Sequence, residues 1–269
     1  MAAVLSWGCA DFLGGYAAKS TDPFLLTAIA HAAGLVLVGS IALLQHAPYP
    51  SQAAVMWSLA GGISGGVCLA IFYRSLAAGQ MGLNGPTAAL IGASIPVAVG
   101  FATQGFPHPI QIAGFVFAAI GIFLVSKPDR ISGRPAGLGL AIIAGLGFAG
   151  FFLFLKQAGD SSAIWVATLT RLSSVIVVGA IALAKYLRQR LQNRLAWVGI
   201  IAGLLDVSGT YCFVRASQTG RLDVSVVLSS LYPVITVVLA RLILKERLTP
   251  LKATGMAAAI VAMPLIVLK

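Results

Sequence analysis

The chain has 269 residues, of which 59% are hydrophobic and only 9% are charged. An ordinary soluble domain has about 25% charged residues, so this composition excludes a soluble fold and indicates a membrane protein. The formal net charge of +11 does not point to nucleic acid as a partner, because the basic residues stand beside apolar runs and are typical of membrane topology signals.

Apolar runs between polar or Gly/Pro-rich breaks predict an all-α membrane protein with ten transmembrane helices, since about 20 mostly apolar residues cross a hydrocarbon core. The first five helices are expected near residues 2–18, 24–44, 54–78, 85–103 and 109–126. The other five are expected near residues 136–155, 163–184, 195–216, 224–243 and 250–268. The most polar connection, residues 127–135, lies at the midpoint of the chain. It separates two predicted five-helix domains, residues 1–130 and 136–269.

The two halves of the chain repeat each other in sequence. A shift of 140 positions places Trp57 on Trp197, and a shift of one more position places Pro109 on Pro250. Because each half contains an odd number of spans, the second half must enter the membrane in the opposite sense. The sequence therefore predicts inverted repeats, an arrangement typical of secondary transporters with a site near the midplane. Duplication in a non-transporting protein would leave the same pattern.

The third span carries a glycine pattern that bears on helix packing. Gly61-Gly62-Ile63-Ser64-Gly65-Gly66 contains two overlapping GxxxG patterns, which predict close approach between helices within the bundle. This pattern does not identify a dimer interface, so a monomer and a homodimer both remain open.

Pro96 in the fourth span and Pro233 in the ninth each remove a backbone donor. They are either packing kinks or flexible points in helices that line a cavity.

Several motifs resemble EamA-type transporters of the drug/metabolite transporter superfamily. The ninth and tenth helices of that family are similar to Ser229-Ser230-Leu231-Tyr232-Pro233-Val234-Ile235-Thr236-Val237 and Leu244-Lys245-Glu246-Arg247-Leu248-Thr249-Pro250. Its first helix is similar to Ser6-Trp7-Gly8 with Asp11-Phe12-Leu13-Gly14-Gly15. The resemblance implies a ten-helix fold of two inverted EamA domains that moves small metabolites without ATP. Residues 104–109 of the first half depart from the pattern of residues 245–250.

Asp206 is the clearest candidate functional residue, because ionisable groups in a hydrocarbon core are costly and usually face a cavity. It lies nine residues from both Trp197 and Arg215, which places it near mid-depth in the eighth span. It either binds and releases a proton during transport or is a structural aspartate paired with a buried cation. Arg171 is its natural partner and could instead hold an anionic substrate group. The repeat counterpart of Arg171 is His31, which either titrates near neutrality or is a packing residue.

Three further residues are candidates for binding substrate or a proton. Asp11 and Trp7 share one face of the first predicted helix, so both are expected to look into the same cavity unless that span sits shallow. Tyr232 adjoins Pro233, which makes it the best tyrosine candidate. The cysteines stand singly in apolar segments without ligand spacing, so neither a metal nor another cofactor is expected.

These features together predict a secondary transporter that moves a small metabolite or drug across the cell inner membrane by alternating access, with proton coupling as an option. An enzyme is not expected, because the sequence has no Walker loop, HExxH or GxSxG motif. The alternatives are a non-transporting sensor or scaffold, and a lipid-carrier flippase, which a lateral opening lined with apolar residues would favour. The expected partners are a small-molecule substrate and the lipid bilayer.

The two lines of evidence on orientation disagree. Loops after odd-numbered spans and their flanks hold thirteen Lys and Arg residues, against four on the opposite side. The positive-inside rule then places both termini outside the cytoplasm. The family resemblance implies cytoplasmic termini instead. We follow the charges, because these residues lie close to the spans, where the rule is strongest.

Overall fold

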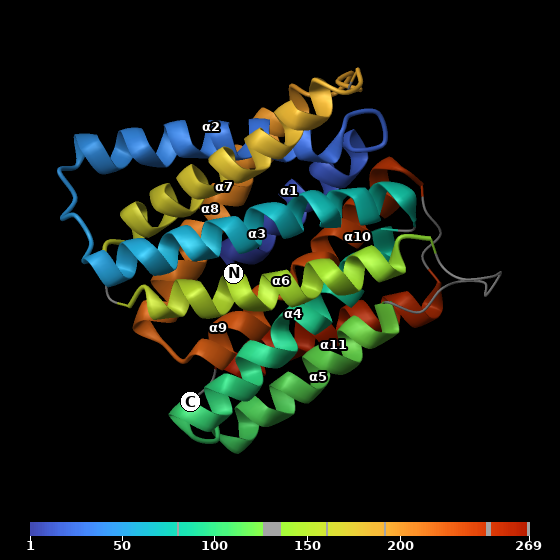
Figure 1. Ribbon diagram of the computed structural model, residues 1–269. Helices are drawn as coiled ribbons and strands as arrows, with labels where there is room; N and C mark the ends of the chain where they lie inside the picture. The colour runs from blue at the N-terminus through green and yellow to red at the C-terminus, as the bar shows by residue number, and fades with distance from the viewer. Residues whose placement is uncertain (80, 126–135, 160, 191, 246–248, 268–269) are drawn as a thin grey trace.

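The computed structural model describes residues 1–79, 81–125, 136–159, 161–190, 192–245 and 249–267. Within these residues the fold is all-helical (Figure 1). The helices are α1 (Ala2–Ala17), α2 (Pro23–Leu44), α3 (Gln52–Ala78), α4 (Met81–Gln104), α5 (Pro109–Val125), α6 (Leu138–Gln157), α7 (Ala163–Tyr186), α8 (Val198–Thr219), α9 (Leu222–Ser229), α10 (Tyr232–Ile243) and α11 (Pro250–Val267).

Eight helical stretches of the described chain are long and apolar enough to cross a membrane, α9 and α10 counting as one stretch from Leu222 to Ile243. The other two helices, α1 and α5, are shorter at 16 and 17 residues. All ten stretches lie where the apolar runs predicted spans, with limits that differ by only a few residues. The linker expected at residues 127–135 lies outside the described residues.

The ninth apolar stretch is interrupted. Helix α9 ends at Ser229 and α10 begins at Tyr232, which leaves Ser230 and Leu231 in a turn. Pro233 lies in the first turn of α10, where its missing N–H costs no intrahelical hydrogen bond. Helix α4, by contrast, runs through Pro96 without interruption. Of the two prolines expected to disturb their helices, Pro233 therefore adjoins an interruption and Pro96 does not.

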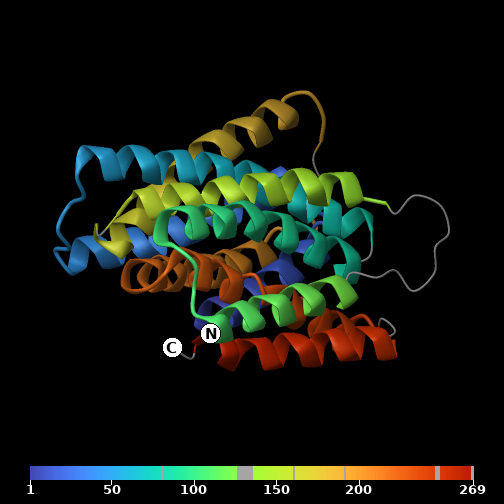
Figure 2. The ribbon, with the colours of Figure 1, turned by 90° about the horizontal axis from the view of Figure 1, so that it is seen from below.

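The helices form a bundle in which the long elements lie side by side (Figures 1 and 2). Helix α5 packs along α11 at one edge, and α2 packs along α7 towards the opposite edge. Between these pairs, α3 packs against α6 and α1 packs against α8. Helix α4 lies against α6 and against the α9–α10 stretch. The centre of the bundle is thus formed by helices from both halves of the chain.

The glycines of α3 allow close approach on two sides of that helix. A Cβ atom at Gly66 would collide with Ser174 of α7, and one at Gly65 would meet the Phe151 ring of α6. Gly62 likewise faces α7. The overlapping GxxxG patterns therefore serve packing inside the bundle, which confirms that expectation from the sequence.

Loop contacts define the two ends of the bundle. At one end the amide of Asp22, between α1 and α2, donates to the carbonyl of Gln192, between α7 and α8, at 2.7 Å. At the other end Arg221, between α8 and α9, donates to the carbonyl of Gln104, at the end of α4, at 3.0 Å. We name the first the odd-loop end, because its loops follow odd-numbered spans, and the second the even-loop end, because its loops follow even-numbered spans.

Basic residues gather at the odd-loop end. Its described connections and flanks contain Lys19, Arg74, Lys185, Arg188, Arg190, Arg194, Arg241, Lys245 and Lys252. The even-loop end has Lys156, Arg215 and Arg221 among the described residues. Lys185 at the first end forms an ion pair with Asp22, and Arg221 at the second forms one with Asp223.

Candidate functional site

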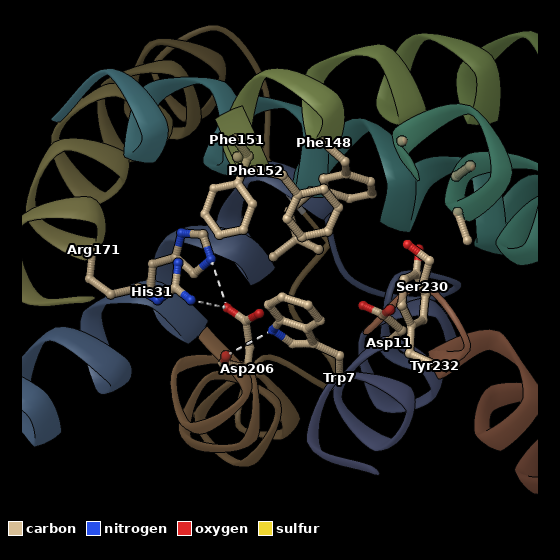
Figure 3. A pocket seen from close by; sticks show the side chains of 15 residues that line it. Trp7, Asp11, His31, Phe148, Phe151, Phe152, Arg171, Asp206, Ser230 and Tyr232 are labelled. Atoms are coloured by element: carbon tan, nitrogen blue, oxygen red, sulfur yellow. Dashed lines mark hydrogen bonds and ion pairs between the residues drawn. The ribbon is translucent and has the colours of Figure 1, made fainter. Parts of the chain in front are cut away.

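A central cavity of about 50 Å³ lies where helices of both halves converge (Figure 3). The residues that line it come from α1, α2, α3, α4, α6, α7, α8 and the α9–α10 stretch. They are Trp7, Asp11, His31, Gly65, Leu69, Ala88, Ala89, Gly92, Phe148, Phe151, Phe152, Arg171, Asp206, Ser230 and Tyr232. A cavity needs about 10–15 Å³ of this water-accessible volume to hold one water, so the central cavity has room for a few waters.

A buried ionic cluster forms one end of the cavity. Arg171 of α7 places Nη2 2.9 Å from Oδ2 of Asp206 on α8. His31 of α2 places Nε2 3.2 Å from the same carboxylate oxygen. Arg171 and His31 are only 3% and 1% exposed, so the cluster lies deep within the bundle. The expectation that Arg171 and Asp206 are neighbours agrees with this geometry.

Polar side chains around the cluster complete its hydrogen bonds. Arg171 also donates from Nη2 to Oγ1 of Thr210, at 2.5 Å. Ser174 Oγ lies 2.5 Å from Nδ1 of His31. When His31 is neutral and Nε2–H donates to Asp206, its Nδ1 accepts the Ser174 proton, so one tautomer satisfies both contacts. The cluster is then electrically neutral, because Arg171 and Asp206 cancel.

Small residues on α2 and α8 bring His31 to Asp206. A Cβ atom at Gly203 of α8 would collide with the backbone of Ala30 on α2, and Gly34 of α2 faces the carbonyl of Gly203. The two helices therefore approach more closely than larger side chains would allow. Without that approach His31 would not reach the carboxylate one helix away.

Asp11, Ser230 and Tyr232 form the other end, which we name the Asp11 end. All three are buried, at 6%, 0% and 5% exposure. The hydroxyls of Ser230 and Tyr232 have no hydrogen-bond partner among the described residues. The carboxyl of Asp11 forms no ion pair with any residue that the structure describes. Among the described residues, the carboxyl at this end therefore lacks an opposite charge and the two hydroxyls lack hydrogen-bond partners, unlike the groups of the ionic cluster.

Trp7 stands between the two ends (Figure 3). Its indole N–H donates to the backbone carbonyl of Asp206 at 3.1 Å. Its ring lies 5.9 Å from the ring of Phe152 and 6.5 Å from that of Tyr232, measured between centroids. Gly209 of α8 makes room for it, because a Cβ atom there would collide with the indole. The middle of the cavity is consequently aromatic.

The structure brings all six of the predicted binding candidates to this one cavity. They are Trp7, Asp11, His31, Arg171, Asp206 and Tyr232. Pro96 and Pro233 are not among the residues that line it. The sequence did not single out Ser230 or the three phenylalanines of α6. For Ser230 a signal existed, since it belongs to the Ser-Ser-Leu-Tyr-Pro segment; the phenylalanines were hidden in a uniformly apolar run.

Comparisons with known proteins bear on what this cavity serves. A family model described as the EamA-like transporter family matches residues 135–268, the second of the two halves. The chain belongs to the EamA-like transporter family. A solved structure titled "Crystal structure of protein" has a TM-score of 0.74 at 18% identity, over 99% of this chain and 98% of that one. It shows that the fold extends through both halves.

No curated protein matches the sequence of this EamA-family chain. Family membership and the apolar helices identify a multi-pass membrane protein of a family that transports small solutes.

Proposed function

We propose that this EamA-family chain is a secondary transporter that moves a small metabolite or drug across the inner membrane by alternating access. The central cavity would be its substrate site. The observation that carries the proposal is the buried cluster of Arg171, Asp206 and His31, which faces this cavity from three helices. Ionisable groups at such depth are expensive, and in transporters they mark substrate or ion pathways.

The packing of the helices supports two inverted domains, residues 1–130 and 136–269. Helix α1 packs against α8, and its repeat counterpart α6 packs against α3. Helices α2 and α7 pack against each other, as do α5 and α11. Each of these contacts maps onto another, or onto itself, when the halves are exchanged. Inverted repeats commonly place the substrate site between them, where this cavity lies.

The size of the cavity supports movement during transport. A volume of about 50 Å³ is too small for a metabolite, since ligand pockets usually occupy about 300–1,000 Å³. A substrate that lies wholly within this cavity therefore requires the lining helices to separate. The break between α9 and α10 gives one of these helices two segments that can move relative to each other.

Of the two carboxyls in the cavity, Asp11 is the better candidate for a coupling proton. The charge of Asp206 is already balanced by Arg171 at 2.9 Å. Asp11 forms no ion pair with a described residue, so a proton would neutralise a charge that the protein does not. Asp206 is then assigned to the structural pair, the second interpretation that its sequence position left open.

Reconstitution in liposomes tests the proposal. A panel of labelled amino acids, nucleosides and cationic drugs is offered with and without a pH gradient. We expect the wild-type chain to accumulate at least one of them and Asp11→Asn to lose the response to the gradient. Asp22→Asn is the matched control, because asparagine also caps a helix and Asp22 lies outside the cavity. Equal uptake of every compound by liposomes with and without the protein would refute the proposal.

A further inference from the structure

A second, larger cavity adjoins the central one. It has a volume of about 300 Å³ and lies between α4, α5 and α9. Its walls are almost entirely apolar and include Leu90, Ala93, Val97, Phe101, Phe115 and Ile122. Val116 of α5, which is 52% exposed, and the exposed Ala119 form part of its outer side, so it opens towards the surface of the bundle. We name it the α4–α5 groove.

The groove and the central cavity meet at Ser230, which lines both. Ser230 lies in the turn between α9 and α10, and its hydroxyl is buried without a partner among the described residues. Figure 3 shows Ser230 and Tyr232 on the same side of Trp7 as Asp11, away from Arg171 and His31. The apolar groove therefore ends at the carboxylate-bearing end of the cavity.

We propose that the substrate is an amphiphilic primary amine whose ammonium group binds at Asp11, Ser230 and Tyr232 and whose hydrocarbon chain lies in the α4–α5 groove. This inference rests on the proposed function and names the class of substrate for the same site.

The charge and hydrogen-bonding capacity of the Asp11 end select the head group. The ionic cluster is neutral by itself, so whenever Asp11 has released its proton the cavity carries a negative charge that a cation can balance. A primary ammonium has three N–H donors, and Asp11, Ser230 and Tyr232 offer three acceptor groups. The ring of Tyr232 and the indole of Trp7, 6.5 Å apart, add faces that attract a cation. An anionic head group, such as the phosphate of a lipid carrier, would meet repulsion here.

The groove selects the rest of the molecule. Its apolar walls stabilise a hydrocarbon chain and offer little to a polar one. Because it opens on the outside of the bundle, a chain longer than the groove extends into lipid. Each methylene buried in the groove should raise affinity by about fourfold.

Calorimetric binding of butylamine, hexylamine and octylamine to the full chain in nanodiscs tests the inference, with the heat of partitioning into empty nanodiscs subtracted. We expect saturable binding that tightens with chain length, and octylamine should bind more tightly than octanoate or octyltrimethylammonium. Asp11→Asn should weaken all three amines by about tenfold or more, which corresponds to the loss of a charge-assisted bond of about 1.4 kcal/mol or more. Ser230→Ala should weaken them less.

Variants at two exposed alanines of α5 distinguish an effect of filling the groove from a general effect of adding a large side chain. Ala119→Phe fills the groove and should abolish the gain from butylamine to octylamine, whereas Ala113→Phe, outside the groove, should keep it. Equal binding by wild type and Asp11→Asn, tighter binding of octanoate, or Na⁺ binding that displaces octylamine would overturn the inference. Because binding does not require transport, octylamine binding with no uptake of octylamine or of any panel compound in liposomes would refute the proposed function, while the amine-binding site itself would stand.

Discussion

At the scale of single residues, the cavity contrasts a balanced charge with an unbalanced one. Arg171, Asp206 and His31 satisfy one another at 2.9 and 3.2 Å. Asp11 faces two unpartnered hydroxyls across the same space. A neutral cluster holds helices together, whereas a carboxylate without an opposite charge is suited to binding a proton or a cationic group of the substrate.

The ion pair predicts a strong coupling between its members. Removing one partner leaves a buried charge uncompensated, so Asp206→Asn or Arg171→Gln should each lower the free energy of unfolding by about 3–5 kcal/mol. The double variant, which leaves no lone charge, should lose clearly less than the sum. Denaturant unfolding of the purified chain in detergent measures this, and strictly additive losses would contradict the assignment of Asp206 to a structural pair.

Two buried serines should respond in opposite ways to the same change. Ser174→Ala removes the hydroxyl that lies 2.5 Å from Nδ1 of His31, and we expect a loss of about 1 kcal/mol in unfolding free energy. Ser230→Ala removes a hydroxyl without a partner among the described residues, and stability should stay the same or rise. The same unfolding measurement compares them. A larger loss for Ser230→Ala would mean that its hydroxyl has a structural partner.

The sequence predicted the charged residues of the site better than its apolar ones. Asp11, Arg171 and Asp206 stood out because a charge inside an apolar run has a cost that needs an explanation. Phe151 and Phe152 carry no such cost, and which face of a helix meets a cavity depends on tertiary packing. Ser230 was visible only as part of a motif, because its role follows from the break between α9 and α10.

At the scale of helices, glycine positions decide how closely α3 and α7 pack. A Cβ atom at Gly62 would collide with the backbone carbonyl of Thr170, so we expect Gly62→Ala to destabilise the chain by about 1–3 kcal/mol. Gly179 of α7 is the matched control, since a Cβ atom there meets nothing within 4 Å. Gly179→Ala should gain up to about 1 kcal/mol through helix propensity. Thermal unfolding distinguishes them, and equal effects would contradict the packing described for α3.

Helix positions followed from the sequence because crossing a membrane requires long apolar runs, and polar or Gly/Pro breaks separate them here. The division of the ninth run into α9 and α10 did not follow, since Leu222 to Ile243 is on average apolar enough to cross a membrane as a single helix. Pro233 marked the neighbourhood of the break. Pro96 carried the same signal in α4, which is continuous, so the residue type alone does not determine where a helix ends.

At the scale of the whole molecule, the uneven charge of its two ends predicts its orientation. The odd-loop end holds most of the described basic residues, and the positive-inside rule places that end in the cytoplasm and both termini outside. A reporter that fluoresces only in the cytoplasm, fused after Lys269, should therefore stay dark. A fusion within the loop between α7 and α8 should be bright. The reverse pattern would show that the resemblance to the family, which implies cytoplasmic termini, is the better guide.

The central claim is that one cavity opens to each side of the membrane in turn. Ala89→Cys, in a chain whose Cys9, Cys68 and Cys212 are replaced by alanine, places a thiol in the wall of that cavity. Ala70→Cys, buried in α3 outside the cavity, is the control. An impermeant thiol reagent is applied to oriented vesicles from either side. Alternating access predicts labelling of Ala89→Cys from both sides and none of the control, whereas labelling from one side only, or from neither, would contradict it.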